Sequence, residues 1–239
     1  MSKTWRDFWN GPQHLSVNPS HAAVLGGEIA RGLLDAGRAK PGQTWLDFGC
    51  GEAPGTSKLL EAGLQLLLFD ESERMRTLVT RRFGGLAGVR VLDPDAYDSL
   101  PSESVDLISV ISVLQYLTPD QFRATLPGWH RTLRPGGLLV LGDLIPRRVN
   151  PLSDTLALLQ FCRRNGYLLA GIRGILATAF SSYGSIRRTA GLTRYDEADL
   201  SDLLDPLGFD WIRWRPNLGV NQSRMTILAT KRRPAPRPA

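Results

Sequence analysis

Cysteine and histidine are scarce in this chain of 239 residues, which has two of the former and three of the latter. Cys50 and Cys162 lie far apart, and a chain of this length builds a core without covalent staples, so a disulfide framework is excluded. The cysteines and histidines also lack the short spacings that hold metal ions. We therefore predict that the protein has no metal site.

Long apolar runs are missing too, since none reaches the roughly 18 residues that a membrane-spanning helix needs. The first ten residues, MSKTWRDFWN, lack the apolar core of a signal peptide. These absences predict a cytoplasmic protein. A hydrophobic content of 42% excludes general disorder and fits a single domain over residues 1–230. We expect the basic, proline-rich tail at 231–239 to be disordered.

The net charge of +6 is unevenly distributed. Residues 144–195 contain eight arginines and a single acidic residue, Asp154. The tail adds four more basic residues, so the rest of the chain is net acidic. Because the body is not basic, we expect no specific nucleic-acid partner.

Apolar runs alternate with helical patterns over the first 143 residues, which is typical of βαβ units and a parallel sheet. Strands are predicted at 43–48, 64–70, 88–92, 105–111 and 138–143, and helices at 19–38, 54–63, 72–83 and 119–132. A helix at 196–204 and strands at 208–214 and 224–230 are expected to complete the fold. Ligands of such sheets bind at the carboxyl ends of the strands. The side chains expected there are Asp47, Asp70, Asp93 or Asp95, Ser109 and Asp143.

The sharpest local signal is the run Leu46-Asp47-Phe48-Gly49-Cys50-Gly51 between a strand and a helix. Its glycines permit a tight turn and a close approach of backbone to ligand. Asp70 ends the next strand, where a carboxylate accepts hydrogen bonds from ribose hydroxyls. A dinucleotide is the competing ligand, but Gly55 comes one residue late for the third glycine of that motif. No tyrosine precedes a lysine by four residues, as short-chain dehydrogenases require.

Four motifs in order give the chain a resemblance to class I S-adenosylmethionine-dependent methyltransferases of the bacterial type 11 kind. They are LDFGCGEAPG, LFDES, the pair DPDA…LP with VDLISVISVLQYL, and LRPGGLLVLGD, over residues 40–145. The resemblance implies an α/β fold: a doubly wound, Rossmann-like, seven-stranded sheet, mostly parallel, with an antiparallel last strand. It also implies S-adenosyl-L-methionine as cofactor and methyl transfer to a small-molecule acceptor.

The same resemblance implies roles for individual residues. Asp47, Gly49 and Gly51 would bind the methionine part of the cofactor, and Asp70 its ribose. Asp95 and Ala96 would read the adenine, and Ser109 and Ile111 would line the cofactor through their backbone. The spacing from the Asp-Ala pair to Leu-Pro is one residue longer than usual, so Asp93 is an alternative adenine reader, with Asp95 preferred.

A displacement at an activated methyl group needs alignment more than it needs a universal catalytic residue. The sequence therefore leaves the catalytic residue unknown. His14, His21 and Tyr116 are the first candidates to test, whereas His130 beside Trp129 is expected to be scaffold. Oxygen is the favoured acceptor atom, before nitrogen or carbon. The absence of an Asp/Asn-Pro-Pro-Tyr motif disfavours DNA bases as acceptors.

The arginine-rich stretch at about 150–192 is predicted to form a helical lid. It and the later N-Q-x-R-M-T strand resemble a subset of the same enzymes. Three roles stay open for its arginines: a solvated lid, recognition of an anionic or lipid-linked acceptor, and peripheral contact with an anionic membrane. The last role would also suit a non-catalytic binding module, the alternative function. Trp5, Phe8 and Trp9 are expected either to cap the site or to pack on the sheet edge, and both monomer and homodimer remain open.

Overall fold

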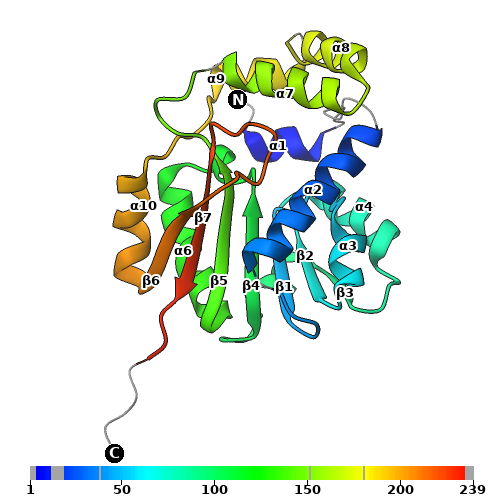
Figure 1. The fold of residues 1–239 in the computed structure, drawn as a ribbon. Helices are drawn as coiled ribbons and strands as arrows, with labels where there is room; N and C mark the ends of the chain where they lie inside the picture. The colour runs from blue at the N-terminus through cyan, green and yellow to red at the C-terminus, as the bar shows by residue number, and fades with distance from the viewer. Residues whose placement is uncertain (1–3, 12–18, 38, 151, 180, 235–239) are drawn as a thin grey trace, which may run out of the picture.

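The computed structural model describes residues 4–11, 19–37, 39–150, 152–179 and 181–234 (Figure 1). Its centre is one seven-stranded sheet in the order β3-β2-β1-β4-β5-β7-β6. Only β7 runs antiparallel to its neighbours, as predicted. The strands are β1 (Thr44–Phe48), β2 (Gln65–Phe69), β3 (Val89–Leu92), β4 (Val105–Ile111), β5 (Leu133–Leu144), β6 (Phe209–Trp214) and β7 (Met225–Lys231).

Helices cover both faces of the sheet (Figure 1). One face packs against α2 (Pro19–Gly37), α3 (Thr56–Glu61) and α4 (Glu73–Phe83). The other packs against α5 (Pro94–Asp98), α6 (Pro119–Thr132) and α10 (Glu197–Leu204). Two short 3-10 helices, η1 (Leu114–Tyr116) and η2 (Asp205–Leu207), complete these connections. The doubly wound α/β prediction is therefore confirmed.

Local sequence explains where the helices next to the site begin. The Ser72 side chain accepts the Met75 amide and starts α4 directly after the tip of β2. Thr118 and Gln121 form a capping box at the start of α6, and Pro119 occupies the first turn, where a missing N–H costs nothing. These caps fix where each chain segment leaves the strand ends.

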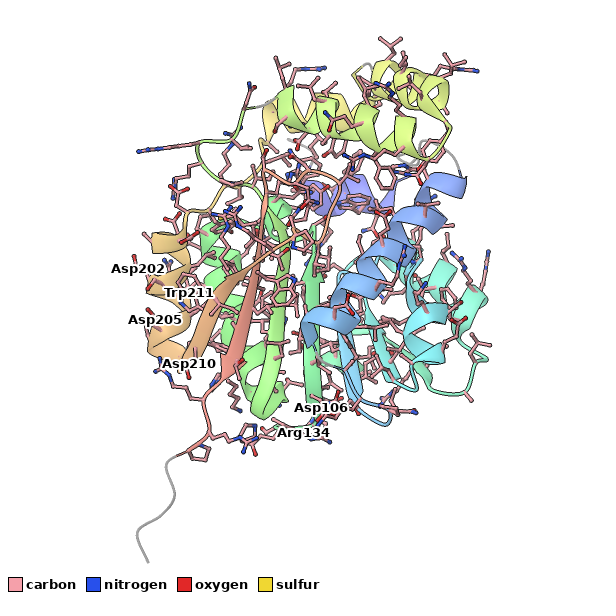
Figure 2. The ribbon with its side chains drawn as sticks, viewed as in Figure 1. Asp106, Arg134, Asp202, Asp205, Asp210 and Trp211 are labelled. Atoms are coloured by element: carbon pink, nitrogen blue, oxygen red, sulfur yellow. The ribbon has the colours of Figure 1, made fainter. Side chains whose placement is uncertain are left out.

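The fifth strand begins earlier than predicted. The segment Arg134-Pro135-Gly136-Gly137 was expected to precede a strand at 138–143, but it lies inside β5. A register shift between Val105 and Leu107 of β4 accommodates the extra residues. Arg134 and Asp106 pair at 2.6 Å there, and Figure 2 shows the two side chains together at the end of the sheet away from the lid.

The tail prediction was wrong at its first residue. Lys231 belongs to β7, where it pairs with Phe209 of β6, and its ammonium donates to the Leu133 carbonyl oxygen at 2.8 Å. Arg232 pairs with Asp210 on the neighbouring strand. Residues 235–239 lie outside the described part of the chain, so the predicted disorder there stays a prediction.

Three helices cross the carboxyl ends of the strands in the segment predicted as a lid (Figure 1). They are α7 (Leu152–Arg164), α8 (Leu168–Ala179) and α9 (Ser182–Thr189). The short helix α1 (Trp5–Asn10) lies between these helices and the sheet. Among the described residues, no helix has both the length and the apolar character needed to cross a membrane.

Candidate functional site

The loop after β1 folds back over the tip of β2. Gly49 and Gly51 have left-handed φ angles of +73° and +54°. The amides of Gly49 and Cys50 both donate to the Phe69 carbonyl oxygen, at 2.8 and 3.0 Å. This turn needs glycine, because a side chain disfavours positive φ. It places backbone at the switch in strand order between β1 and β4, where ligands of open α/β sheets bind.

The two glycines differ in what surrounds them. A Cβ atom on Gly49 would lie 2.4 Å from Cγ2 of Val113, whereas a Cβ atom on Gly51 would meet nothing within 4 Å. We expect Gly49→Ala to lower the free energy of unfolding by about 3 kcal/mol, from strain and overpacking together. Gly51→Ala should cost only about 1 kcal/mol, from strain alone. Urea denaturation of both variants checks this, and equal losses would contradict it.

Asp70 closes the loop from the neighbouring strand. Its Oδ2 accepts the Gly51 amide at 2.9 Å, and its Oδ1 accepts the Ser72 amide at 2.8 Å. Burial raises the pKa of this carboxyl, although the two amides oppose the shift. Each carboxylate oxygen has a second acceptor position, so two amide bonds leave capacity for ligand hydroxyls.

Asp47 lies partly buried on β1, which pairs with β2, the strand that Asp70 follows. Its Oδ1 accepts the Ser109 hydroxyl at 2.7 Å, and that hydroxyl accepts the Trp45 indole N–H at 2.9 Å. Burial raises the pKa of Asp47 to about 6, the Ser109 hydrogen bond lowers it, and the charge of Asp70 raises it. Within the described ranges no lysine or arginine pairs with Asp47. A buried carboxylate without a cation is costly, and it suits a positively charged ligand group.

Ser109 lies inside the sheet, next to Asp47 on one side and Val140 on the other. Its side chain orients Asp47 through their hydrogen bond. Ile111 stands nearer the tip, paired with Gly142 of β5. The predicted contacts of Ser109 and Ile111 with the cofactor through the backbone stay predictions.

The predicted adenine-binding pair sits on α5, beside the tip of β2. Tyr97 of this helix stacks on Phe69, with ring centroids 4.3 Å apart. Asp95 is exposed, while Asp93 caps the helix by accepting the Ala96 amide at 2.7 Å. Asp93 thus caps the helix, whereas no residue in the described part of the chain bonds to the Asp95 carboxylate, which favours Asp95 of the two alternatives. The Ala96 amide, however, is already bonded to Asp93.

Aromatic side chains of α1 cover the strand ends. Trp5 lies 4.6 Å from Tyr116 and 5.7 Å from Tyr183, between ring centroids. Trp9 also contacts Tyr116, and its carbonyl oxygen accepts the Ser72 hydroxyl at 3.0 Å. The helix therefore bridges the tip of β2, η1 and the lid helix α9. The sequence left open whether these aromatic residues cap the site or pack on the sheet edge. In the structure they lie over the strand ends, as a cap does (Figure 1).

The candidates for proton transfer differ in their surroundings. Burial raises the pKa of Tyr116 well above its ordinary value, so this phenol keeps its proton at neutral pH. Burial lowers the pKa of His21, whose Nδ1 lies 3.4 Å from the Tyr167 hydroxyl, under the lid. His130 packs edge-on against Phe209, as expected of scaffold. His14 lies outside the described residues.

The largest polar network of the site centres on a residue to which the sequence analysis gave no role. Arg224, in the N-Q-x-R-M-T segment, donates to Asp143 at 2.7 Å and to Asp154 at 3.0 and 2.9 Å. All three side chains are largely buried, with 11% of the Arg224 side chain exposed. Asp143 ends β5 and Asp154 lies on α7. One guanidinium therefore joins the lid to the sheet.

Backbone strain surrounds this network. Ser112 and Asp143 both have left-handed φ angles, +57° and +62°. The Ser112 hydroxyl donates to Asp143 Oδ2 at 2.8 Å, and the Asn217 amide donates to Oδ1 at 3.1 Å. Strain of this kind persists where the surroundings fix it, often at functional sites. The sequence contained one signal for this network, which is that Asp154 is the single acidic residue among the arginines of the lid.

A cleft of about 310 Å³ opens beside the network. Arg187 and Arg194 lie on its wall with Asp154, and Arg187 pairs with Asp154 at 3.3 Å. The remaining wall is mainly apolar, from Ile145, Val149, Gly191 and Leu192. Two arginines against one carboxylate make this cleft electropositive.

Comparison with known proteins shows similarity to methyltransferases over part of the chain. Residues 46–141 match the family described as methyltransferase domain. An uncharacterized methyltransferase of Geobacillus kaustophilus is 33% identical over 112 residues, covering 46% of this chain and 51% of that protein. A carboxy-S-adenosyl-L-methionine synthase of Pseudomonas putida is 31% identical over 149 residues, covering 57% and 60%. The chain spans between a third and about three fifths of the first curated relatives it matches.

Solved structures extend the likeness to the fold of nearly the whole chain. The N-methyltransferase NodS of Bradyrhizobium japonicum, in complex with S-adenosyl-L-homocysteine, superposes with a TM-score of 0.54. That match covers 94% of this chain and 92% of NodS at 20% sequence identity. At this identity the comparison concerns the fold alone.

Proposed function

We propose, from the premise that this chain carries a class I S-adenosylmethionine-dependent methyltransferase domain, that it transfers a methyl group to a small-molecule acceptor. The observation that carries the proposal is the carboxylate-flanked loop at the tips of β1 and β2. Asp47 and Asp70 lie on neighbouring strands, and Gly51 is hydrogen-bonded to Asp70 at 2.9 Å.

The residues present fit S-adenosyl-L-methionine. Asp47 is partly buried and has no cationic partner among the described residues, and the cofactor's ammonium group would supply one. Asp70 has acceptor positions left for ribose hydroxyls. Gly51 leaves open space where a side chain would stand. Asp95 on α5 would accept a hydrogen bond from the adenine amine, and the Ala96 N–H would donate to the adenine ring nitrogen N1 once it leaves Asp93.

When bound, S-adenosyl-L-methionine supplies a methyl group already activated by its positive sulfur. The residues of this chain mainly hold an acceptor in line with it, and alignment contributes roughly 7–11 kcal/mol to such reactions. Helix α1 and the lid helices lie over the strand ends (Figure 1), where they would exclude water from the reaction. Tyr116 keeps its proton, so it acts as a hydrogen-bond donor and not as a base.

The electropositive cleft beside the lid suggests the class of acceptor. Arg187 and Arg194 would pair with a carboxylate or phosphate, and the apolar wall would hold a hydrocarbon part. We therefore propose a polar-anionic or lipid-linked metabolite as the acceptor. Oxygen is the favoured acceptor atom, ahead of nitrogen or carbon. A bidentate arginine contact would fix its orientation.

Isothermal titration of the folded protein with S-adenosyl-L-methionine tests the proposal directly. Saturable binding in one site is expected, and no heat of binding from a protein with intact circular dichroism would contradict it. Transfer from labelled cofactor to candidate acceptors then identifies the substrate.

Asp70→Ala should weaken cofactor binding at least tenfold. The ribose would lose a charged hydrogen bond, which is worth about 1.5–3 kcal/mol. Because Asp70 also accepts two loop amides, circular dichroism must accompany the titration. Asp98→Ala is the matched control, an exposed aspartate on α5 that should change nothing. Unchanged affinity in a folded Asp70→Ala variant would remove Asp70 from the site.

A further inference from the structure

Large apolar side chains are exposed mainly on one part of the molecule. Eight are exposed among the described residues, and six of them belong to the lid helices α7 and α8. The most exposed is Leu169, with 77% of its surface open to solvent. Large apolar side chains exposed together on two helices in contact point to an interaction site. The six residues, called the lid face below, are Leu152, Leu156, Leu168, Leu169, Ile172 and Leu176.

The lid face follows helical periodicity. On α7, Leu152 and Leu156 are one turn apart, and on α8 the exposed positions recur at similar intervals up to Leu176. The opposite sides of these helices are packed. Phe161 and Cys162 are buried, and a Cβ on Gly171 would lie 2.7 Å from the Cys162 sulfur. The two helices thus pack closely and still turn leucines outward.

The charged side chains that helices α7 and α8 themselves expose are all positive. Arg163, Arg164 and Arg173 are exposed on the same helices. The single acid of the segment, Asp154, turns inward and is held by Arg224 and by the Asn221 amide at 2.7 Å. Within the described part of the lid, no acid therefore offsets these arginines.

We infer that the lid face docks onto an anionic lipid bilayer. Leucines enter the interfacial region while arginines pair with anionic head groups, as in other peripheral amphipathic helices. A second copy fits less well, because it would bring arginines against arginines. The described end of the basic tail cannot cover the face, since β7 ends on the opposite side of the molecule (Figure 1).

This inference goes beyond methyl transfer, because it holds whether or not the strand-end site is catalytic. With the lid on a bilayer, the cleft lined by Arg187 and Arg194 beside the lid would lie near the membrane surface. An acceptor held in the lipid leaflet would then reach the cleft without crossing bulk water.

Co-sedimentation with vesicles tests the charge component. The full chain should sediment with vesicles of phosphatidylcholine plus phosphatidylglycerol and remain in solution with phosphatidylcholine alone. The double change Arg163→Gln, Arg164→Gln should lower the partition coefficient roughly thirtyfold, from the contribution of two surface arginines. Arg81→Gln with Arg82→Gln on α4 removes the same charge from an exposed pair away from the lid and should change binding far less.

A second pair of variants tests the apolar component. Leu169→Ser with Ile172→Ser should lower partitioning at least tenfold, because two apolar side chains no longer leave water. Ile212→Ser, at an exposed position on β6 with 59% of its surface open, is the control. Cofactor titration should be unchanged in all lid variants, which separates this test from that of the proposed function.

Equal partitioning of lid variants and their controls would overturn the inference, as would equal binding to neutral and anionic vesicles. Light scattering of the protein in solution tests the alternative that a second copy of the chain binds the lid face. A dimer that Leu169→Ser with Ile172→Ser converts to monomer would assign the lid face to a second copy instead.

Discussion

Arg224→Met should be the most destabilising single change at the site, lowering the free energy of unfolding by about 4 kcal/mol and the melting temperature by roughly 10 °C. The guanidinium contacts two largely buried carboxylates, Asp143 and Asp154. Methionine fills similar space but leaves both carboxylates without their main cation. Thermal unfolding followed by circular dichroism measures the loss.

Two further variants make this result specific. Arg147→Met removes an exposed pair with Asp199 and should lower the stability far less, because solvent screens such a pair. Adding Asp143→Asn to Arg224→Met should restore part of the stability, because one buried charge disappears. A loss in Arg224→Met no larger than in Arg147→Met would show that the network does not hold the lid.

The same network predicts which part of the Arg224→Met variant unfolds first. Arg224 links Asp154 on α7 to Asp143 at the end of β5, so its loss should free the lid before the sheet unfolds. Limited proteolysis should then cut within α7–α9 faster than in the unmodified protein, while the sheet resists. This outcome would make Arg224 a positioning residue for the acceptor cleft.

Asp47→Asn should stabilise the ligand-free protein and weaken cofactor binding at the same time. Burial raises the pKa of Asp47 from 3.8 to about 6, so its charged form costs folding roughly 3 kcal/mol at neutral pH. Asparagine keeps an acceptor for the Ser109 hydroxyl without the charge. We expect a rise of roughly 8 °C in melting temperature and a loss of about a hundredfold in affinity for S-adenosyl-L-methionine.

The stability difference should depend on pH in a defined direction. Because the folded protein holds the Asp47 proton more tightly than the unfolded chain, the penalty is complete above about pH 6. It shrinks as the pH falls and vanishes below about 3.8, where both states are protonated. The advantage of Asp47→Asn should fade over this window. A variant that is less stable at neutral pH yet binds normally would make Asp47 a structural cap.

Local sequence determined most of the elements at the site. Helix 19–38 was predicted from apolar spacing and glycine, and α2 spans Pro19–Gly37. The strand at 105–111 and the helix at 119–132 have their predicted bounds. These signals are strong because buried parallel strands are continuous apolar runs and capped helices have defined starts. The helices α1 and α5 were not predicted, since neither is longer than six residues.

The sequence by itself determined the chemistry of the loop after β1, because glycines and carboxylates at strand ends act through their immediate neighbours. Only the tertiary structure decided the partners of Asp154 and the orientation of the lid leucines. Arg224 lies 70 residues from Asp154, and no local pattern encodes such a contact. Nor could periodicity alone tell which side of α8 would face solvent, because an apolar stripe looks the same whether a core or a membrane receives it.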